Sequence, residues 1–392
     1  MPTKPSNYSP PERPPFKSIA LLLQGGGALG AYQAGIYEGL AEAGIDPDWV
    51  AGISIGAANA AIIAGNPPEK RVARLREFWE GITAAPWRGY TEALAPFFLF
   101  SNDMRSFFNQ ASAGGTVFSG VPGFFEPRLQ QPWLYPPDAP GPTSYYDTTP
   151  LRATLERLID FDRLNQGQPR FSAGAVSLRT GNFVYFDTTT HRIRAEHVMA
   201  SGALPPGFPA IEIGGDYYWD GGLVSNTPLY WVLECGPRQD TLAFQVDLWS
   251  ARGKLPGNIA EVMVREKEIQ YSSRTREITD RFSAAQKLRH MIGDALAALP
   301  PEIKAKPEIA QLAAETDHSL YHIVHLIYRS KHYEGDSKDF EFSRLSMEEH
   351  WRAGYNDAVA TLRHKEIFER PAGRTGVFTF DIGRTTVTEK SV

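Results

Sequence analysis

The chain has little cysteine, no long apolar run and no export signal that can be recognised. Cys235 is the single cysteine among 392 residues, which excludes an intramolecular disulfide framework and fits a reducing compartment. The longest apolar stretch, residues 53–64, falls well short of the ~20 residues that a membrane-spanning helix needs. Residues 1–16 are rich in proline and polar side chains and lack the apolar core of a signal peptide. We therefore expect a cytoplasmic protein and leave peripheral contact with a membrane open.

The chain also lacks a block of basic residues. Its formal net charge is −5 at pH 7. We therefore expect no nucleic-acid partner, because proteins that bind nucleic acids concentrate positive charge on one face. Hydrophobic residues make up 42% of the chain and charged residues 22%, which indicates a globular protein of one elaborate domain or two.

A glycine triplet follows a short apolar run near the N-terminus. Residues 18–23 read Ser-Ile-Ala-Leu-Leu-Leu, which is typical of a fully buried strand, and Gly25, Gly26 and Gly27 come soon after. Residues 28–43 contain no proline and repeat apolar side chains at near-helical spacing, so they predict a helix that ends at Gly44. The free N–H groups at the start of this helix would point at whatever lies on the glycine loop.

A serine lies between the next predicted strand and helix. Residues 49–53 predict a strand, and residues 55–64 predict a buried, alanine-rich helix. The pentad Gly52-Ile53-Ser54-Ile55-Gly56 spans the junction and satisfies Gly-x-Ser-x-Gly. This pattern is typical of a nucleophile elbow, in which small residues let the helix and the strand pack closely around an exposed serine.

The glycine triplet permits a second interpretation. Gly25, Gly27 and Gly30 also satisfy the Gly-x-Gly-x-x-Gly pattern of dinucleotide-binding proteins. That pattern requires an acidic residue at the end of the second strand to hold a ribose. Here Ile53 and Ser54 occupy that position, so the nucleotide interpretation fails.

A carboxylate and two glycines form a third motif. Asp220-Gly221-Gly222 ends an aromatic run, and the segments 201–209 and 226–229 flank it. The three motifs, taken in this order with both flanking segments, resemble the patatin-like phospholipase family, whose members are lipid acyl hydrolases. The resemblance covers residues 17–235.

The resemblance implies a three-layer α/β/α fold with a mostly parallel central sheet, and a Ser–Asp dyad without a histidine. Ser54 would be the nucleophile and Asp220 the general base in cleaving a lipid or other acyl ester through an acyl-enzyme. Backbone N–H groups of the glycine loop would bind the tetrahedral oxyanion. The implied site comprises catalytic Ser54 and Asp220, oxyanion-hole residues Gly25, Gly26, Gly27 and Ala28, and supporting glycines Gly30, Gly52, Gly56, Gly221 and Gly222. No metal and no cofactor are expected.

One position departs from the family's pattern. The family's glycine loop often has lysine or arginine where this chain has Leu29. A cation at this position could lie near a lipid phosphate. Its absence leaves esterase chemistry intact and makes neutral acyl esters as suitable as phospholipids.

The composition along the chain divides it into three parts. We expect a disordered tail at residues 1–16, the acyl hydrolase domain at 17–250 and a mainly helical C-terminal extension at 251–392. Within the domain, residues 84–150 are crowded with proline, glycine and aromatics. This composition predicts either a cap with its own small core, or a lid or acyl-chain funnel beside Ser54. Residues 258–292 predict one long helix or two, and a capping box at Ser346 predicts the start of another. The extension could serve helical packing or dimerisation.

Two other classes of protein remain open. An ordinary α/β-hydrolase would use a Ser–Asp–His triad, and His318, His322 and His325 follow Asp220 in the required order. Against this, the elbow of such enzymes usually follows several strands, whereas Ser54 follows only two. His322 and His325 also fit structural roles better, because their spacing in a strand-like run points them to opposite faces. The other alternative is a lipid-binding scaffold that keeps the fold without catalysis.

Overall fold

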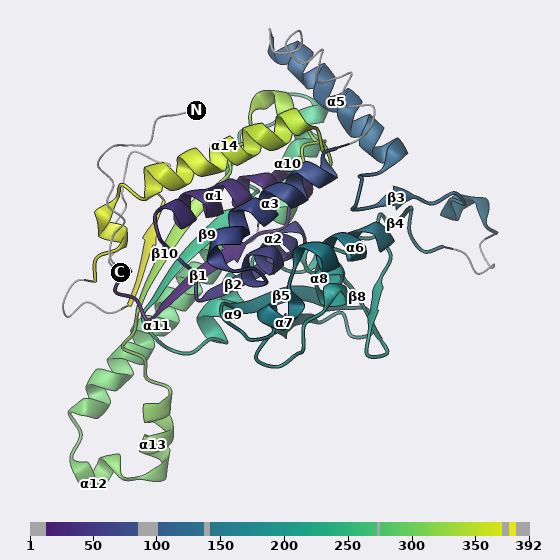
Figure 1. Cartoon of the computed structure of the whole chain (residues 1–392). Coiled ribbons are helices and arrows are strands. Elements are labelled where there is room, and N and C mark those ends of the chain that lie inside the picture. The colour runs from purple at the N-terminus through teal and green to yellow at the C-terminus, as the bar shows by residue number, and fades with distance from the viewer. Residues whose placement is uncertain (1–12, 85–100, 137–141, 273–274, 371–375, 382–392) are drawn as a thin grey trace.

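The computed structural model describes residues 13–84, 101–136, 142–272, 275–370 and 376–381 (Figure 1). Most of the predicted tail, residues 1–12, and the first part of the predicted cap, residues 85–100, lie outside these ranges. Phe16, the last residue of the predicted tail, is buried and packs against the His322 ring.

Nine strands form one sheet within the described residues, in the order β11-β10-β9-β1-β2-β5-β8-β7, with β6 also paired to β5. The pairs from β11 through β5 in this order are parallel, and β5 pairs antiparallel with both β6 and β8. The sheet strands are β1 (Ser18–Leu23), β2 (Trp49–Ile53), β5 (Arg170–Ser177), β6 (Phe183–Asp187), β7 (Ile211–Ile213), β8 (Asp216–Asp220), β9 (Thr241–Asp247), β10 (Leu320–Ile327) and β11 (Gly376–Phe380). A separate antiparallel pair joins β3 (Glu126–Pro127) to β4 (Tyr146–Asp147).

The helices connect these strands and cover the sheet. They are α1 (Ala31–Glu42), α2 (Ile55–Ala64), α3 (Pro68–Ile82), α5 (Asn102–Ser119), α6 (Thr149–Leu158), α7 (Phe161–Leu164), α8 (Ala195–Ser201), α9 (Leu229–Glu234), α10 (Ile259–Tyr271), α11 (Thr275–Ala297), α12 (Pro301–Lys304), α13 (Pro307–Ala314) and α14 (Arg344–Thr361). No described helix is both long enough and apolar enough to cross a lipid bilayer.

Both faces of the sheet are covered, as the composition of its first strand requires. Ile19, Leu21 and Leu23 of β1 belong to a large apolar cluster with α1, α2 and α14, whereas Ala20 and Leu22 belong to a second cluster on the other face. A strand points successive side chains to opposite faces, so an uninterrupted apolar run has to be buried on both. The predicted three-layer α/β/α fold with a mostly parallel sheet is confirmed.

The C-terminal part of the chain contributes to the same sheet and core. Strands β10 and β11 extend the sheet beyond β9, and α14 packs along α1 (Figure 1). The two helices approach so closely that a Cβ at Gly354 would lie 2.0 Å from the Tyr32 carbonyl oxygen. The described residues between 251 and 381 are mainly helical, and the predicted boundaries between the three parts stay a prediction.

The structure corrects one sequence prediction for this region and decides another that was left open. The helix predicted to start at the Ser346 capping box begins at Arg344 instead, because the Ser343 hydroxyl is the cap that accepts a hydrogen bond from the Ser346 N–H. The segment predicted as one helix or two forms two, α10 and α11.

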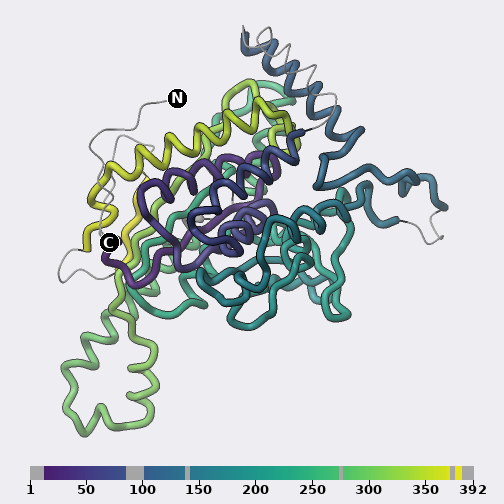
Figure 2. The backbone as a smooth tube through the Cα atoms, in the orientation of Figure 1, coloured from purple at the N-terminus to yellow at the C-terminus, as the bar shows by residue number. Residues whose placement is uncertain are grey.

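A helical arm extends from the body of the molecule. Helix α11 leads outward, α12 and α13 follow it, and the chain then returns to β10 (Figures 1 and 2). We refer to residues 299–316 as the arm.

Candidate active site

Ser54 occupies a strained turn between β2 and α2. It has φ 55° and ψ −125°, and it alone among the described non-glycine residues has a positive φ. Its N–H donates to the carbonyl oxygen and the hydroxyl of Ser201, at 3.1 and 3.0 Å. A residue held in such a sparsely populated conformation at the end of a strand is the hallmark of a nucleophile elbow.

The glycines beside Ser54 allow the elbow to close. A Cβ at Gly52 would lie 2.2 Å from the carbonyl oxygen of Gly56, and a Cβ at Gly56 would lie 2.2 Å from that of Leu23. Strand β2, helix α2 and the end of β1 therefore pack backbone against backbone. Similar contacts restrict Gly30 beside Ile55 and Gly221 beside the Gly174 carbonyl oxygen, while Gly222 adjoins the Asp220 carboxylate.

Asp220 lies at the end of β8 and is buried at 2% exposure. Its carboxylate accepts a 2.7 Å hydrogen bond from the Gly222 N–H and also interacts with the Ser54 hydroxyl. Burial raises the pKa of this carboxyl to about 7, although the hydrogen bonds from Ser54 and Gly222 oppose that shift. The two predicted catalytic residues, which are far apart in the sequence, thus meet in space.

Of the four backbone N–H groups predicted to form the oxyanion hole, two are free to bind a ligand and two face carbonyl oxygens of the protein. The Gly25 N–H faces the Asn226 carbonyl oxygen at 3.4 Å, and the Ala28 N–H donates to the Asp339 carbonyl oxygen at 2.8 Å. Within the described part of the chain, the N–H groups of Gly26 and Gly27 have no hydrogen-bond acceptor. These two groups are therefore open to a ligand, whereas Ala28 is engaged in holding the loop.

Asn226 clamps the glycine loop from the side. Its amide nitrogen donates to the carbonyl oxygens of Gly25 and Tyr271, at 3.0 and 2.9 Å. A Cβ at Gly25 would lie 2.4 Å from the Asn226 Oδ1 and 3.0 Å from the Ser54 Cβ. The sequence singled out the segment 226–229, but gave no role to this side chain.

A segment between β10 and α14 supports the loop from the other side, and the sequence gave no sign of it. Besides the Ala28 contact, the Asp339 carbonyl oxygen would lie only 2.0 Å from a Cβ at Gly27, whose φ is +55°. Lys267 of α10 holds this segment by donating to the Asp336 carbonyl oxygen and the Asp339 carboxylate, at 2.7 and 2.8 Å. The C-terminal part of the chain therefore helps to shape the site.

An apolar cavity of about 410 Å³ adjoins these groups. Ser54, Asp220 and the glycine triplet form one part of its wall, and aromatic rings form much of the rest. Phe125 contacts Phe124, Phe208 and Phe342 with ring centroids 5.0–6.4 Å apart. The predicted cap region supplies Thr116, Val117, Phe124, Phe125, Tyr145 and Tyr146 to the lining.

Leu29 does not face this cavity. Its side chain is fully buried in the core of the molecule and is not among the residues that line the cavity. The expectation that a cation at this position would lie near a lipid phosphate is therefore wrong for this chain. The helical turn over residues 27–30 directs the side chain inward, which the loop sequence alone could not show.

The histidines considered for a triad lie elsewhere. All nine histidines of the chain fall within the described residues, and none lines the cavity. His322 is buried under β11 residues and its Nδ1 faces the Ile367 carbonyl oxygen at 2.8 Å. His318 lies outside the sheet, next to His290.

The fold and this site define the class: an α/β/α protein with a serine elbow, a buried carboxylate and open backbone N–H groups. The family described as patatin-like phospholipase matches residues 21–232, and a second family, described as patatin phospholipase, matches residues 269–374. The chain therefore belongs to the patatin-like phospholipase family, and the resemblance predicted from its motifs is confirmed.

Solved structures with a similar arrangement are distant. VipD from Legionella pneumophila is 14% identical with a TM-score of 0.37, and the match covers 91% of this chain and 67% of that one. ExoU from the type III secretion system of Pseudomonas aeruginosa, solved in complex with SpcU, is 17% identical with a TM-score of 0.24; the match covers 77% of this chain and 60% of that chain. The chain thus spans about two thirds or less of the length of these proteins. No curated protein sequence matches it.

Proposed function

We propose that this protein is a serine lipid acyl hydrolase that cleaves acyl esters through a Ser54–Asp220 dyad and an acyl-enzyme. The observation that carries the proposal is the contact between the Ser54 hydroxyl and a buried carboxylate at the wall of an apolar cavity. A serine hydroxyl becomes an effective nucleophile when a base within hydrogen-bond reach takes its proton during attack.

Each residue of the site has a separate role in the proposed reaction. Asp220 accepts the Ser54 proton as the oxygen attacks the ester carbonyl, and the N–H groups of Gly26 and Gly27 stabilise the oxyanion that forms. One such donor contributes on the order of 3 kcal/mol to catalysis. Protonated Asp220 then returns the proton to the leaving alkoxide, and a water molecule that Asp220 activates releases the acyl group from Ser54.

The lining of the cavity favours an acyl chain with a neutral head group nearby. Its aromatic wall suits a hydrocarbon chain, and no lysine or arginine is among the described residues that line it. A phosphate inside the cavity would lack a cationic partner. A panel of neutral acyl esters, lysolipids and phospholipids, read by mass spectrometry of the released fatty acids, tests this preference. Hydrolysis of none of them, including a short-chain nitrophenyl ester, would favour the non-catalytic scaffold.

The pH dependence of the reaction follows from Asp220. Because its pKa is raised to about 7, the carboxyl is protonated at lower pH and cannot accept the serine proton. We expect kcat/KM to rise about tenfold per pH unit below that pKa and to level off above it. Stopped assays between pH 5 and 9, corrected for spontaneous hydrolysis, measure the profile.

Asp247 provides a control for this profile. It is the C-terminal residue of β9, its pKa is also raised to about 7 by burial, and it does not line the cavity. Asp247→Asn should keep the wild-type midpoint. A wild-type rate that stays constant down to pH 5 would contradict the role of Asp220.

An exposed apolar rim continues from the cavity and suits contact with a lipid surface. Val117 and Tyr145 line the cavity; Phe118, next to Val117, is 84% exposed, and Trp133, 68% exposed, lies against the Tyr145 ring. We propose that this rim contacts membranes peripherally.

Removing the rim should weaken binding to vesicles. The double variant Phe118→Ser/Trp133→Ser is expected to lose most co-sedimentation with phosphatidylcholine vesicles, while its turnover of a soluble nitrophenyl ester stays close to wild type. Leu312→Ser removes an exposed apolar side chain from the arm and serves as the matched control. Equal sedimentation of the double variant and the control would contradict the rim's role.

A further inference from the structure

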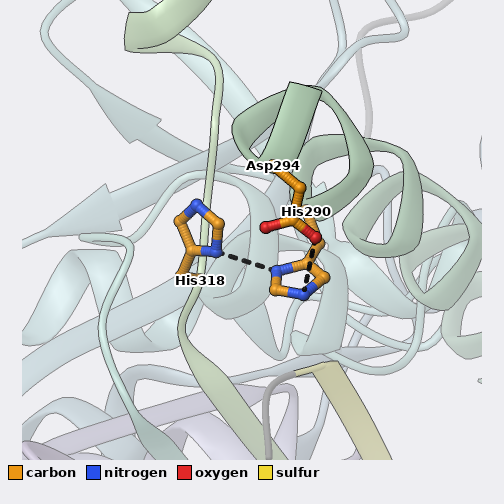
Figure 3. A group of neighbouring side chains, drawn as sticks. All are labelled: His290, Asp294 and His318. Carbon is orange, nitrogen blue, oxygen red and sulfur yellow. Dashed lines mark hydrogen bonds and ion pairs between the residues drawn. The ribbon is translucent and has the colours of Figure 1, made fainter. Parts of the chain in front are cut away.

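Three side chains that commonly bind metal ions meet at the base of the arm. His290 and Asp294 are one turn apart on α11, and His318 lies in the segment that returns from the arm to β10 (Figure 3). The Nδ1 atoms of the two histidines are 2.8 Å apart, and the His290 Nε2 is 3.6 Å from the Asp294 Oδ2. One ligand atom from each residue lies within 4.8 Å of the other two.

These separations suit a transition-metal ion. Zinc bonds of about 2.0–2.2 Å to imidazole nitrogen and carboxylate oxygen place tetrahedral ligands roughly 3.3 Å apart. His290 uses different ring nitrogens for its two contacts, Nδ1 toward His318 and Nε2 toward Asp294, so its ring has to turn before one nitrogen can share an ion with both. One ligand atom from each residue already lies within 4.8 Å of the other two, which keeps this adjustment within the reach of side-chain rotation. A donor set of two imidazole nitrogens and one carboxylate favours zinc and related divalent transition metals. Magnesium and calcium prefer sites made of oxygen ligands. His290 is half-buried and the other two are exposed, which lets an ion enter from solvent and keep water as its fourth ligand.

The backbone of α11 makes room for this meeting. A Cβ on Gly293 would lie 2.3 Å from the His318 Nε2 and 2.7 Å from its Cε1. The ring of His318 therefore packs against the helix where a side chain is missing, and it also contacts the His290 ring edge-on at 4.7 Å between centroids. Any larger residue at position 293 would displace His318 from its two neighbours.

We propose that His290, Asp294 and His318 form a binding site for a divalent transition-metal ion of the zinc type, which ties the two ends of the arm together. The ligands come from either side of residues 295–317, so a bound ion closes this loop at its base. Such a cross-link reduces the conformational freedom of the arm. Because the ion binds only when the three ligands are together, it stabilises the folded form of the arm.

This site is separate from the proposed chemistry. His318 precedes β10, whereas Ser54 follows β2. Strands β10, β9, β1 and β2 run parallel, so His318 lies at the N-terminal ends of these strands and Ser54 at their C-terminal ends. The proposal therefore stands or falls independently of the acyl hydrolase function. Ester hydrolysis by the wild-type protein should be the same with zinc and after chelation.

Metal titration of the full chain tests the proposal. Protein freed of metal with a chelator is titrated with Zn²⁺ by calorimetry and with Co²⁺ by visible absorption, where a nitrogen- and oxygen-ligated cobalt ion gives a d–d spectrum. We expect one ion per chain. His318→Ala and Asp294→Asn should each weaken binding by about tenfold or more. Limited proteolysis within the arm should slow when zinc is added to wild type, but not when it is added to His318→Ala.

Two further variants separate the site from adventitious surface binding. Gly293→Ala leaves all three ligands in place but should weaken zinc binding by displacing the His318 ring, with the fold checked by circular dichroism. His364→Ala removes a surface histidine that pairs with one carboxylate, Glu366, and should leave binding unchanged. Absence of binding by wild type, or equal binding by the wild-type, His318→Ala and Asp294→Asn proteins, would overturn the proposal.

Discussion

Replacing Ser54 with alanine should lower ester turnover by at least about 10³-fold, because the acyl group then has no oxygen to which it can be transferred. The alanine also has to adopt the same positive φ of 55°, which costs on the order of 1–2 kcal/mol of stability for a residue with a Cβ, as it already does for serine. The loss of rate should therefore occur in a folded protein. Initial rates with a nitrophenyl ester, with circular dichroism as a check, give the result.

Ser225→Ala is the matched control. This serine lies beside Asn226, its hydroxyl faces the Thr227 carbonyl oxygen at 3.3 Å, and it does not line the cavity. Its variant should keep most of the wild-type rate. A folded Ser54→Ala protein that retained turnover would show that another nucleophile acts.

Replacing Asp220 with asparagine should lower the rate of acylation by about 10²–10⁴-fold, the usual contribution of a general base. The amide keeps the size of the carboxyl group but cannot take the serine proton. It also leaves the Gly222 N–H with an oxygen acceptor, so the turn over residues 221–223 should persist. Single-turnover kinetics with a nitrophenyl ester separate acylation from release of the acyl group.

Histidine variants distinguish the dyad from a triad. His325→Ala and His322→Ala should retain most of kcat, since neither residue lines the cavity. A triad histidine would behave differently, because its removal should cost as much as loss of the nucleophile. A folded histidine variant as inactive as Ser54→Ala would favour the α/β-hydrolase alternative.

The sequence predicted those parts of the site that depend on local patterns. The apolar run of β1, the glycines after it and the pentad around Ser54 each specify a strand, a turn and a helix within a few residues, because glycine is required where backbones meet. Asp220 was predictable only through the resemblance to the family. Its burial, and the resulting rise of its pKa, depend on the sheet that places β8 beside β5.

Contacts between distant segments could not be predicted. Nothing near Ala28 indicates that its N–H bonds the Asp339 carbonyl oxygen, and nothing near Leu29 indicates that its side chain turns into the core. The same holds for the cluster of His290, Asp294 and His318. In the sequence, His318 is only one of three histidines that follow Asp220 in the order of a triad, whereas its neighbours in the structure are on α11. Such contacts depend on how segments far apart in the chain pack together. A single sequence does not indicate which distant segments will meet.

Covalent labelling tests the central claim most directly. The wild-type protein is treated with a fluorophosphonate, digested, and the modified peptide is sequenced by mass spectrometry. If Ser54 is the nucleophile that Asp220 activates, one phosphonate per chain should be found on Ser54, and labelling should be absent in Ser54→Ala and slowed in Asp220→Asn. A phosphonate on any other serine, or labelling of Ser54→Ala at the wild-type rate, would contradict the account.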